Sequence, residues 1–284
     1  MADGCAITGV GSYVPERVLT NADLEKIVDT TDDWITSRTG IRERRTAAEG
    51  EHTSSMGIAA ARIALERAGV DAADLDLIIV ATITPDMPFP ATACIVQQEL
   101  GATKAAAFDL EAACTGFLYA LEIGRQFIDS RMYQNVLIIG AEKLSSIIDW
   151  KDRNTCVLFG DGAGAAVLQH RADSRGVLAT RLGSDGGKAN ILAMPGGGCR
   201  QPATVNSVNE RIHFLKMEGK EVFKNAVNAM TGAAKEVLER SKLEIKDIKC
   251  VIPHQANQRI ISAVGERLGT RDDQVFVNLH KYGN

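Results

Sequence analysis

Short runs of β-branched and other apolar residues alternate along the chain with longer stretches in which apolar positions recur every three or four residues. The short runs predict buried strands, and the longer stretches predict amphipathic helices. Because the two patterns alternate, we expect an α/β fold in which helices cover both faces of a largely parallel sheet. The clearest predicted strands are residues 77–81, 136–139, 163–169, 250–252 and 275–278, and the clearest predicted helices are residues 54–68, 91–100, 115–130, 221–240 and 258–268.

The same order of elements occurs twice, which indicates an internal duplication. Four pairs of segments match in order, with one shorter loop in the second copy: 65–67 with 238–240, 78–81 with 251–254, 100–101 with 268–269, and 108–110 with 276–278. We therefore predict two similar halves, residues 1–172 and 173–284, with the glycine-rich stretch 183–209 as a loop region between them.

The second copy ends at Asn284, which aligns with Gly116 in the first. The first copy continues through a helix and two predicted strands, about 50 residues by this alignment. We therefore expect the C-terminal part of the duplicated fold to be missing from this chain.

Cys114 directly follows a predicted strand and lies at the start of an apolar-periodic helix whose broad face includes Phe117, Leu118, Leu121 and Ile128. The amino end of a helix presents free N–H groups and a positive dipole, which favour thiolate over thiol. Such a sulfur is a nucleophile suited to acyl transfer. Small buried cysteines are also common in Ala-rich cores, and spacing alone does not separate the two interpretations.

His254 follows the predicted strand 250–252, at the end where α/β sheets usually bind ligands. Capping of the next helix is the plainer role for such a histidine. The duplication favours a catalytic role for His254 over a capping role, because it places His254 and Cys114 in corresponding halves. His280 is a second candidate, and Asn284 lies in the turn that corresponds to that of Cys114, although a terminal residue is usually frayed. The remaining histidines, His52, His170 and His213, are expected to be structural.

Composition narrows the class of protein. With 284 residues, 45% of them hydrophobic and 24% charged, the chain is globular rather than fibrous or disordered. Its net charge of −4 argues against a nucleic-acid binder. No stretch approaches the ~20 apolar residues of a membrane span, and Met1 to Val10 does not have the pattern of a signal peptide. We expect a cytoplasmic protein without membrane association, whose six cysteines, with no C-x-x-C pair, are reduced thiols.

Two further motifs have competing interpretations. Residues 160–165 match G-x-G-x-x-A, but a strand rather than a helix follows, so we expect a tight glycine turn in a hairpin, with a dinucleotide site as the lesser alternative. Trp34 stands near a group of basic residues that would suit a phosphorylated ligand with a stacking base, or would simply form a solvated face: Arg38, Arg42, Arg44 and Arg45.

Taken together, four motifs resemble those of β-ketoacyl-acyl-carrier-protein synthase III: residues 113–117, 159–164, 253–257 and 278–284. The resemblance runs from Ile7 to Asn284 and implies a duplicated thiolase-like fold and the initiating condensation of type II fatty-acid synthesis. It implies that Cys114 takes a short acyl group from acyl-CoA, and that His254 and Asn284 assist decarboxylation of malonyl-acyl carrier protein. It implies no metal or redox cofactor, coenzyme A thioester being a substrate.

The same resemblance assigns binding residues. It places Thr30, Trp34, Arg38 and Arg153 around the adenine end of coenzyme A, and Gly219, Phe223, Ala256 and Asn257 along the pantetheine arm. It implies that Phe89 contributes to the acyl pocket of the partner subunit in a homodimer. It also implies that Lys224 and Arg259 dock the acidic carrier protein. The family also continues beyond Asn284, with a segment that supplies an oxyanion donor.

Three alternatives share the fold. A thiolase would use a second cysteine near the carboxyl end, and no cysteine follows Cys250 in this chain. A starter ketosynthase of a polyketide pathway and a non-catalytic acyl-carrier-binding subunit are the others.

Overall fold

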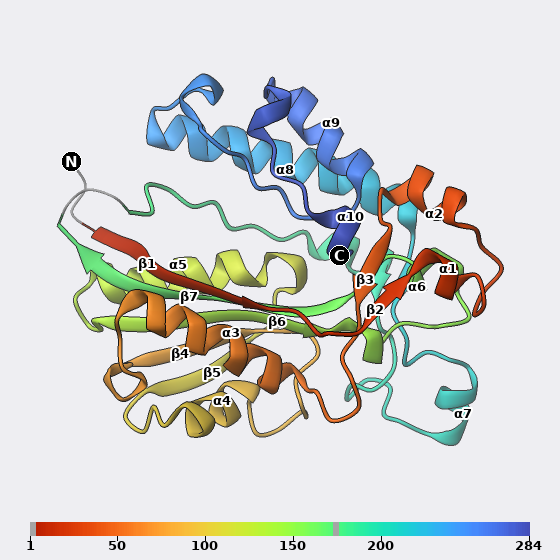
Figure 1. Ribbon diagram of the computed structural model, residues 1–284, viewed down its shortest axis with the longest axis horizontal. Helices are drawn as coiled ribbons and strands as arrows, with labels where there is room; N and C mark the ends of the chain where they lie inside the picture. The colour runs from red at the N-terminus through yellow and green to blue at the C-terminus, as the bar shows by residue number, and fades with distance from the viewer. Residues whose placement is uncertain (1–3, 173–175) are drawn as a thin grey trace. The chain divides into compact units, whose positions relative to one another are not determined.

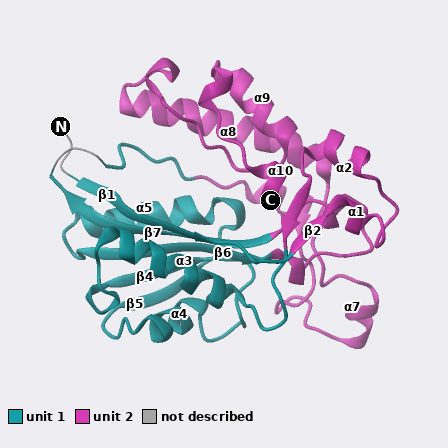
Figure 2. Ribbon diagram, in the orientation of Figure 1, with its two compact units in different colours: residues 1–17, 46–143, 161–182 teal, residues 18–45, 144–160, 183–284 magenta. Residues whose placement is uncertain are grey.

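The computed structural model describes residues 4–172 and 176–284, which form two compact units. Unit 1 comprises Met1–Arg17, Thr46–Lys143 and Asp161–Leu182, and unit 2 comprises Val18–Arg45, Leu144–Gly160 and Gly183–Asn284 (Figure 2). Residue 173, where the sequence predicts the second half to begin, lies outside the described residues, and the division into halves at this point stays a prediction.

Unit 1 is built on a five-stranded mixed sheet (Figure 1). Its strands, in spatial order, are β1 (Gly4–Tyr13), β7 (Asp161–Arg171), β6 (Asn135–Lys143), β4 (Leu77–Ala81) and β5 (Ala106–Leu110). Strand β4 runs parallel to β5 and β6, whereas β7 is antiparallel to both β6 and β1. The α/β class and the predicted strands at 77–81, 136–139 and 163–169 are confirmed.

Helices cover both faces of this sheet (Figure 1). Helices α3 (Thr53–Ala68) and α4 (Thr92–Leu100) pack on one face, and α5 (Gly116–Asp129) packs on the other. Along β4, Ile78 and Val80 join the core beneath α3 and α4, while Leu77, Ile79 and Ala81 join the core beneath α5. All five residues of β4 are buried. At roughly 1.5–3 kcal/mol for each large apolar side chain, this strand anchors unit 1.

Two glycines let β1 lie directly against α3. A Cβ atom at Gly11 would overlap the carbonyl oxygen of Ala60, and one at Gly9 would overlap that of Ala64. Since both obstacles are backbone atoms of α3, they cannot be relieved by a side-chain rotation. Close approach of the strand to the helix therefore requires glycine at both positions.

In unit 2 the longest element is α8 (Gly219–Ser241), which packs against α9 (Gln258–Leu268). Val227 of α8 and Ile260, Val264 and Leu268 of α9 form their shared core. The other helices are α1 (Asn21–Leu24), α2 (Asp32–Thr39), α6 (Arg153–Cys156), α7 (Val205–Asn209) and α10 (Leu279–Tyr282). The strands are β2 (Val18–Thr20) paired with β3 (Glu43–Arg45), and β8 (Leu192–Ala193) paired with β9 (Lys216–Met217).

The strands predicted at 250–252 and 275–278 are wrong as extended elements. Only Val251 and Val275 form a parallel β-bridge, with hydrogen bonds from Val251 N to Gln274 O (2.7 Å) and from Phe276 N to Val251 O (2.9 Å). Ile252 is 72% exposed and Phe276 is 46% exposed. An isolated parallel pair is a weak arrangement, and here it does not extend beyond a single bridge.

Three smaller predictions also need correction. Strands β6 and β7 are antiparallel neighbours, but residues 144–160 between them belong to unit 2, so the glycines at 160–164 do not form a tight hairpin turn. The stretch 183–209 is not all loop, because it includes β8 and α7. Leu118 is 53% exposed, since it lies beside the buried face of α5 rather than on it.

We predict that Gly11→Ala destabilises the protein by about 1–3 kcal/mol, the usual cost of overpacking, because the new methyl group meets the α3 backbone. Gly164→Ala on β7 is the matched control, since the nearest atom to its Cβ position is 4.0 Å away. Urea denaturation of both variants measures the difference. Equal stability of the two variants would contradict the packing described for β1 and α3.

Candidate active site

Cys114 lies in a short 3₁₀ turn, Ala113–Thr115, between the end of β5 and the start of α5. Ala113 has φ = +44°, a left-handed conformation that is strained for a residue with a Cβ atom. The helix start is fixed by Gly116, whose Cβ position would be 3.0 Å from the Cβ of Ala81 at the end of β4. The predicted placement of Cys114 after a strand and before a helix is confirmed.

The electrostatic environment of Cys114 differs from the sequence expectation. Cys114 is exposed as a residue, yet protein packed around the thiol raises its pKa, and the carboxylate of Glu142 raises it further. A backbone N–H at Cys114 opposes these effects but is the smallest contribution. The thiol is therefore the resting form at neutral pH, and the expected preference for thiolate at the helix start is overridden.

Glu142, near the end of β6, was missed in the sequence. Its carboxylate accepts hydrogen bonds from Ile83 N (2.9 Å), from Thr82 Oγ1 (3.2 Å) and from Thr84 Oγ1. Burial raises the pKa of Glu142 even though these hydrogen bonds favour its charged form. A polar residue at the end of a buried strand was the signal that selected His254, and it applies equally to Glu142.

Phe89 lies in the segment between β4 and α4 and is 85% exposed. The segment is anchored nearby, since Asp86 accepts hydrogen bonds from Ser54 N (2.9 Å) and Ser54 Oγ (2.5 Å). The Phe89 ring is therefore exposed to solvent on an anchored loop and is not part of the core of unit 1.

In unit 2, His254 lies in the irregular segment that precedes α9. Its Nε2 atom is buried and has no hydrogen-bond partner among the described residues. Burial lowers the pKa of His254, so the imidazole is neutral at neutral pH. A buried, unpaired polar atom costs free energy, which makes it a candidate for binding a ligand.

Gln255 ties the His254 segment to the segment before α10. Its Nε2 donates to Pro253 O (3.0 Å) and Phe276 O (3.2 Å), and its Oε1 accepts from Asn278 N (3.0 Å) and Leu279 N (3.2 Å). This side chain uses both ends of its amide to hold two loops that lack a ladder of strand hydrogen bonds. The sequence analysis gave it no role.

Asn284 is held by its backbone rather than frayed. Its N–H donates to Leu158 O (2.9 Å), and its carbonyl accepts from Gly160 N (2.9 Å). The preceding Gly283 has φ = +70°, and a Cβ atom there would meet Leu158 O at 3.0 Å. These backbone hydrogen bonds argue against the alternative of a frayed segment at Asn284.

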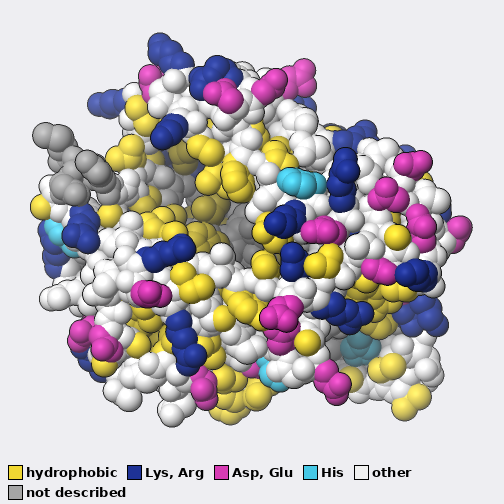
Figure 3. Space-filling view, in the orientation of Figure 1, with side chains coloured by type: hydrophobic (Ala, Val, Ile, Leu, Met, Phe, Trp, Pro, Cys, Tyr) yellow, Lys and Arg dark blue, Asp and Glu magenta, His cyan; other side chains and the backbone are white. Residues whose placement is uncertain are grey.

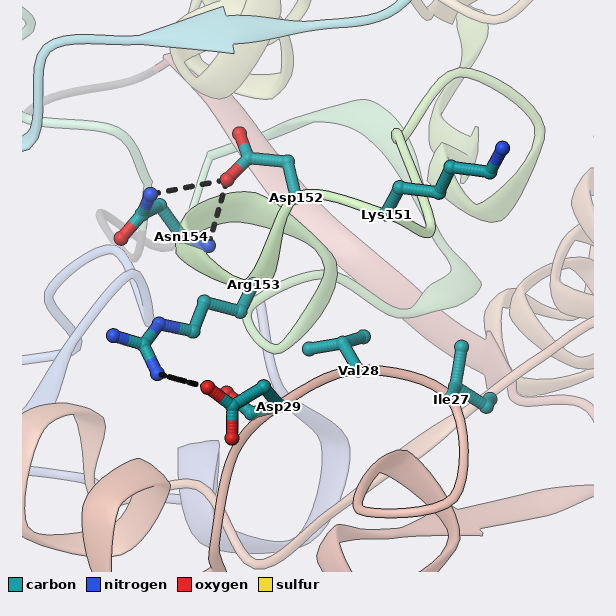
Figure 4. A pocket seen from close by; sticks show the side chains of 7 residues that line it. All are labelled: Ile27, Val28, Asp29, Lys151, Asp152, Arg153 and Asn154. Carbon is teal, nitrogen blue, oxygen red and sulfur yellow. Dashed lines mark hydrogen bonds and ion pairs between the residues drawn. The ribbon is translucent and has the colours of Figure 1, made fainter.

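Trp34, on α2, is in contact with two guanidinium groups. Arg38 lies 4.9 Å and Arg153 lies 5.1 Å from the Trp34 ring centroid. Arg153 also donates to Asp29 O (2.8 Å), beside a pocket of about 420 Å³ lined by residues 27–29 and 151–154 (Figure 4). The hydroxyl of Thr30 is buried without a partner in the described chain. These four predicted residues all lie in unit 2, and Trp34 contacts both Arg38 and Arg153.

The predicted basic group is not a single surface. Arg38 and Arg42 are exposed, but Arg44 is completely buried. Strand β3 explains the difference, because alternate residues of a strand point to opposite faces and only its central residue points inward. Arg44 is therefore unsuited to direct contact with a phosphorylated ligand.

The other predicted binding residues cluster at the starts of α8 and α9. The Arg259 guanidinium lies 5.8 Å from the Phe223 ring. Asn257 caps α9 by accepting from Arg259 N (2.8 Å), and its Nδ2 donates to Arg38 O (3.0 Å). Gly219, Lys224 and Arg259 are exposed, and Ala256 is half-buried. Asn257 thus has a structural role that the sequence analysis did not predict.

Two kinds of feature are absent from residues 4–172 and 176–284. No group of three or more His, Cys, Asp or Glu side chains is placed to hold a metal ion. No helix there combines the length and apolar character needed to cross a membrane.

On the face drawn in Figure 3, acidic and basic side chains are interspersed over both units.

Comparison with known proteins gives one consistent family. A model for 3-oxoacyl-[acyl-carrier-protein] synthase III matches residues 108–186, and the model for the C-terminal part of that enzyme matches residues 238–284. The β-ketoacyl-[acyl-carrier-protein] synthase III of Caldanaerobacter subterraneus is 57% identical over 278 residues, which cover 98% of this chain and 84% of that protein.

Solved structures agree. The 3-oxoacyl-[acyl-carrier-protein] synthase III of Aquifex aeolicus superposes with a TM-score of 0.91 at 49% identity, covering 99% of this chain and 86% of that one. The priming β-ketosynthase of the R1128 polyketide pathway superposes with a TM-score of 0.91 at 39% identity, covering 99% and 84%. The chain belongs to the β-ketoacyl-[acyl-carrier-protein] synthase III family.

Membership confirms the predicted thiolase-like fold and the predicted class of enzyme. The protein is a condensing acyltransferase that initiates fatty-acid synthesis.

We predict that Glu142→Gln lowers the pKa of the Cys114 thiol, because it removes a negative charge that opposes thiolate formation. Alkylation of Cys114 by iodoacetamide, followed by peptide mass spectrometry over a range of pH, should then reach its half-maximal rate at a lower pH. Glu99→Gln, an exposed position on α4, is the control. An unchanged pH profile for Glu142→Gln would contradict the electrostatic coupling.

Proposed function

We propose that Cys114 is the nucleophile that receives a short acyl group from acyl-CoA. The thiol loses its proton, the thiolate attacks the thioester carbonyl, and coenzyme A leaves and takes up the proton. The support is the position of Cys114 at the start of α5, whose first turn has no side-chain cap and so leaves backbone N–H groups available to stabilise an oxyanion.

The second half of the proposal concerns malonyl-acyl carrier protein. Its carboxylate leaves as CO₂, and the electron pair of the broken C–C bond passes to the thioester as an enolate. The enolate carbon then attacks the acyl carbonyl on Cys114, forming the β-ketoacyl thioester and releasing the thiolate, which takes up one proton from water. The chain must stabilise the enolate oxygen, and for this we propose His254 and Asn284.

The observation that carries this proposal is the buried, unpaired Nε2 of His254. In the Nε2–H tautomer a neutral imidazole donates one hydrogen bond at this atom, and no protein acceptor within the described residues takes it. A thioester oxygen that gains negative charge is the acceptor such a donor suits. Asn284, whose backbone is fixed at both its N–H and its C=O, would supply a carboxamide N–H₂ as the second donor.

We propose that coenzyme A binds to residues of unit 2. Trp34, Arg38 and Arg153 offer an aromatic face and two cations for an adenine nucleotide, and Thr30 offers an unpaired hydroxyl. Gly219, Phe223, Ala256 and Asn257 would line the path of the pantetheine arm. Acyl-CoA is a substrate in this scheme, and no step calls for a metal or redox cofactor.

Macromolecular partners are also part of the proposal. Lys224 and Arg259 are exposed cations at the starts of adjacent helices, which suits an acidic acyl carrier protein. Strand β5 is paired only with β4 in the described sheet and exposes Phe108 at its edge, which suits a homodimer in which the exposed Phe89 enters a partner's acyl pocket. A cytoplasmic location stays a prediction from the sequence.

A starter reaction in a polyketide pathway is a second activity, beside the initiation of fatty-acid synthesis, that the similarity to the R1128 priming enzyme favours. The two activities share the chemistry above and differ in the acyl group. Competition between acetyl-CoA and longer acyl-CoA substrates for Cys114 tests the second activity, and exclusive use of acetyl-CoA would contradict it.

We predict that incubation with radiolabelled acetyl-CoA places one acetyl group on Cys114, and that Cys114→Ala abolishes the label. Peptide mass spectrometry locates the site, and Cys94→Ala, another exposed cysteine in unit 1, is the control. Labelling that survives Cys114→Ala would contradict the proposal, because the acetyl group would then be carried by another residue.

We predict that His254→Ala lowers CO₂ release from malonyl-acyl carrier protein by about 10²–10³-fold, the usual effect of losing one oxyanion donor, while Cys114 is still acylated. In the native chain the lowered pKa of His254 keeps the imidazole neutral as pH falls through its ordinary value of about 6.5. Decarboxylation should therefore show no titration of His254 near pH 6.5. Equal loss of acylation and decarboxylation in His254→Ala would contradict the assigned role.

A further inference from the structure

Arg44 is a charged side chain enclosed within unit 2. It is 0% exposed, and no carboxylate in the described chain forms an ion pair with it. Its Nη1 donates to Asn21 Oδ1 (2.8 Å) and Leu19 O (3.2 Å), its Nη2 donates to Val157 O (2.8 Å), and its Nε has no partner. All of its acceptors are neutral.

Such an arrangement costs free energy. A buried cation loses its hydration, and only a paired anion or several hydrogen bonds offset that loss. Burial lowers the pKa of Arg44 to about 10, so the guanidinium stays charged at neutral pH. Stability of the unit alone would be served as well by an apolar side chain of similar volume. The presence of arginine at this position therefore calls for another role.

The surroundings of Arg44 indicate what it supports. A Cβ atom at Gly160 or at Gly283 would lie 3.2 Å from the Cβ of Arg44, so both glycines pack directly on its stem. Residues 157–160, which its guanidinium holds through Val157 O, are the same residues that hold Asn284. Leu158 O accepts from Asn284 N, and Gly160 N donates to Asn284 O.

The planar guanidinium group of Arg44 can donate hydrogen bonds to two separate segments at once. One arm reaches β2 and α1, at Leu19 O and Asn21 Oδ1, and the other reaches Val157 O. Arg42 N, one residue before β3, also donates to His280 O (3.0 Å), which joins this segment to α10 directly. The two segments beside Asn284, residues 157–160 and α10, are thus both bonded to residues 42–44.

We infer that Arg44 is a positioning residue for Asn284: by bonding Val157 and packing on Gly160 and Gly283, it fixes the backbone from which the Asn284 carboxamide reaches the substrate. This inference rests on the proposed function, in which Asn284 donates to the enolate oxygen. It gives Arg44 no contact with substrate.

The experiment separates the two half-reactions in one sample. Acylation of Cys114 by acetyl-CoA and condensation of the acylated enzyme with malonyl-acyl carrier protein are both measured for Arg44→Gln. We expect the acylation rate to stay near that of the native chain and the condensation rate to fall by about 10²-fold, the effect of a misplacement of about 1 Å. Because the acylated fraction counts only folded protein, the ratio of the two rates is unaffected by partial unfolding.

Three further variants sharpen the test. Arg44→Lys keeps the charge but cannot bond both arms, so condensation should remain impaired. In an Asn284→Ala background, Arg44→Gln should cause no additional loss of condensation, because residues that act through one another are not additive. Arg62→Gln, an exposed arginine on α3, should change neither rate.

Equal falls of acylation and condensation in Arg44→Gln would overturn the inference, since they indicate a general structural role. Full activity of Arg44→Lys would overturn it in favour of charge alone, and so would an additive loss in the double variant. A native chain that takes up no acetyl group would overturn the proposed function itself, and that outcome is seen before any variant is compared.

Discussion

Burial of β4 on both faces is the constraint on which unit 1 depends. Side chains of this central strand alternate between the core beneath α3 and α4 and the core beneath α5, so neither face has room for a polar site. Functional groups are left at the carboxyl ends of the parallel strands. Cys114 follows β5, Thr82 follows β4, and Glu142 lies near the end of β6.

The candidate site in unit 2 is held in a different way. The segments around His254 and Asn284 have almost no strand pairing, and side-chain hydrogen bonds replace it. Gln255 joins the His254 segment to residues 276–279, and Arg44 supports residues 157–160, against which Asn284 is bonded. Buried polar groups of this kind specify one geometry at a cost in stability. A catalytic amide and imidazole require such fixed placement.

The sequence predicted the elements whose apolar pattern decides their structure. Residues 77–81 form β4 and residues 258–268 form α9, because each has a buried face and clear ends, such as Asn257 before α9 and Gly269 after it. Residues 250–252 and 275–278 have the same apolar character but form a single bridge. Strand formation depends on neighbours, and an apolar run does not reveal whether neighbours are present.

The positions of the candidate site residues were predicted better than their electrostatic environments. Motifs located Cys114, His254 and Asn284, but the pKa of the thiol is raised first by burial and then by Glu142, which is distant in sequence and brought near by the sheet. Arg44 was grouped with exposed arginines, because a three-residue strand is too short to show which of its side chains points inward. Both errors arise where tertiary contacts, rather than local pattern, set the environment of a charge.

The central claim is that the acyl group on Cys114 is the one that condenses. A pulse of radiolabelled acetyl-CoA, removal of the excess, and a chase with unlabelled malonyl-acyl carrier protein test it most directly. Label should leave Cys114 and enter the β-ketoacyl product at a rate at least equal to steady-state turnover. Product that forms without label, while labelled acetyl stays on Cys114, would contradict it.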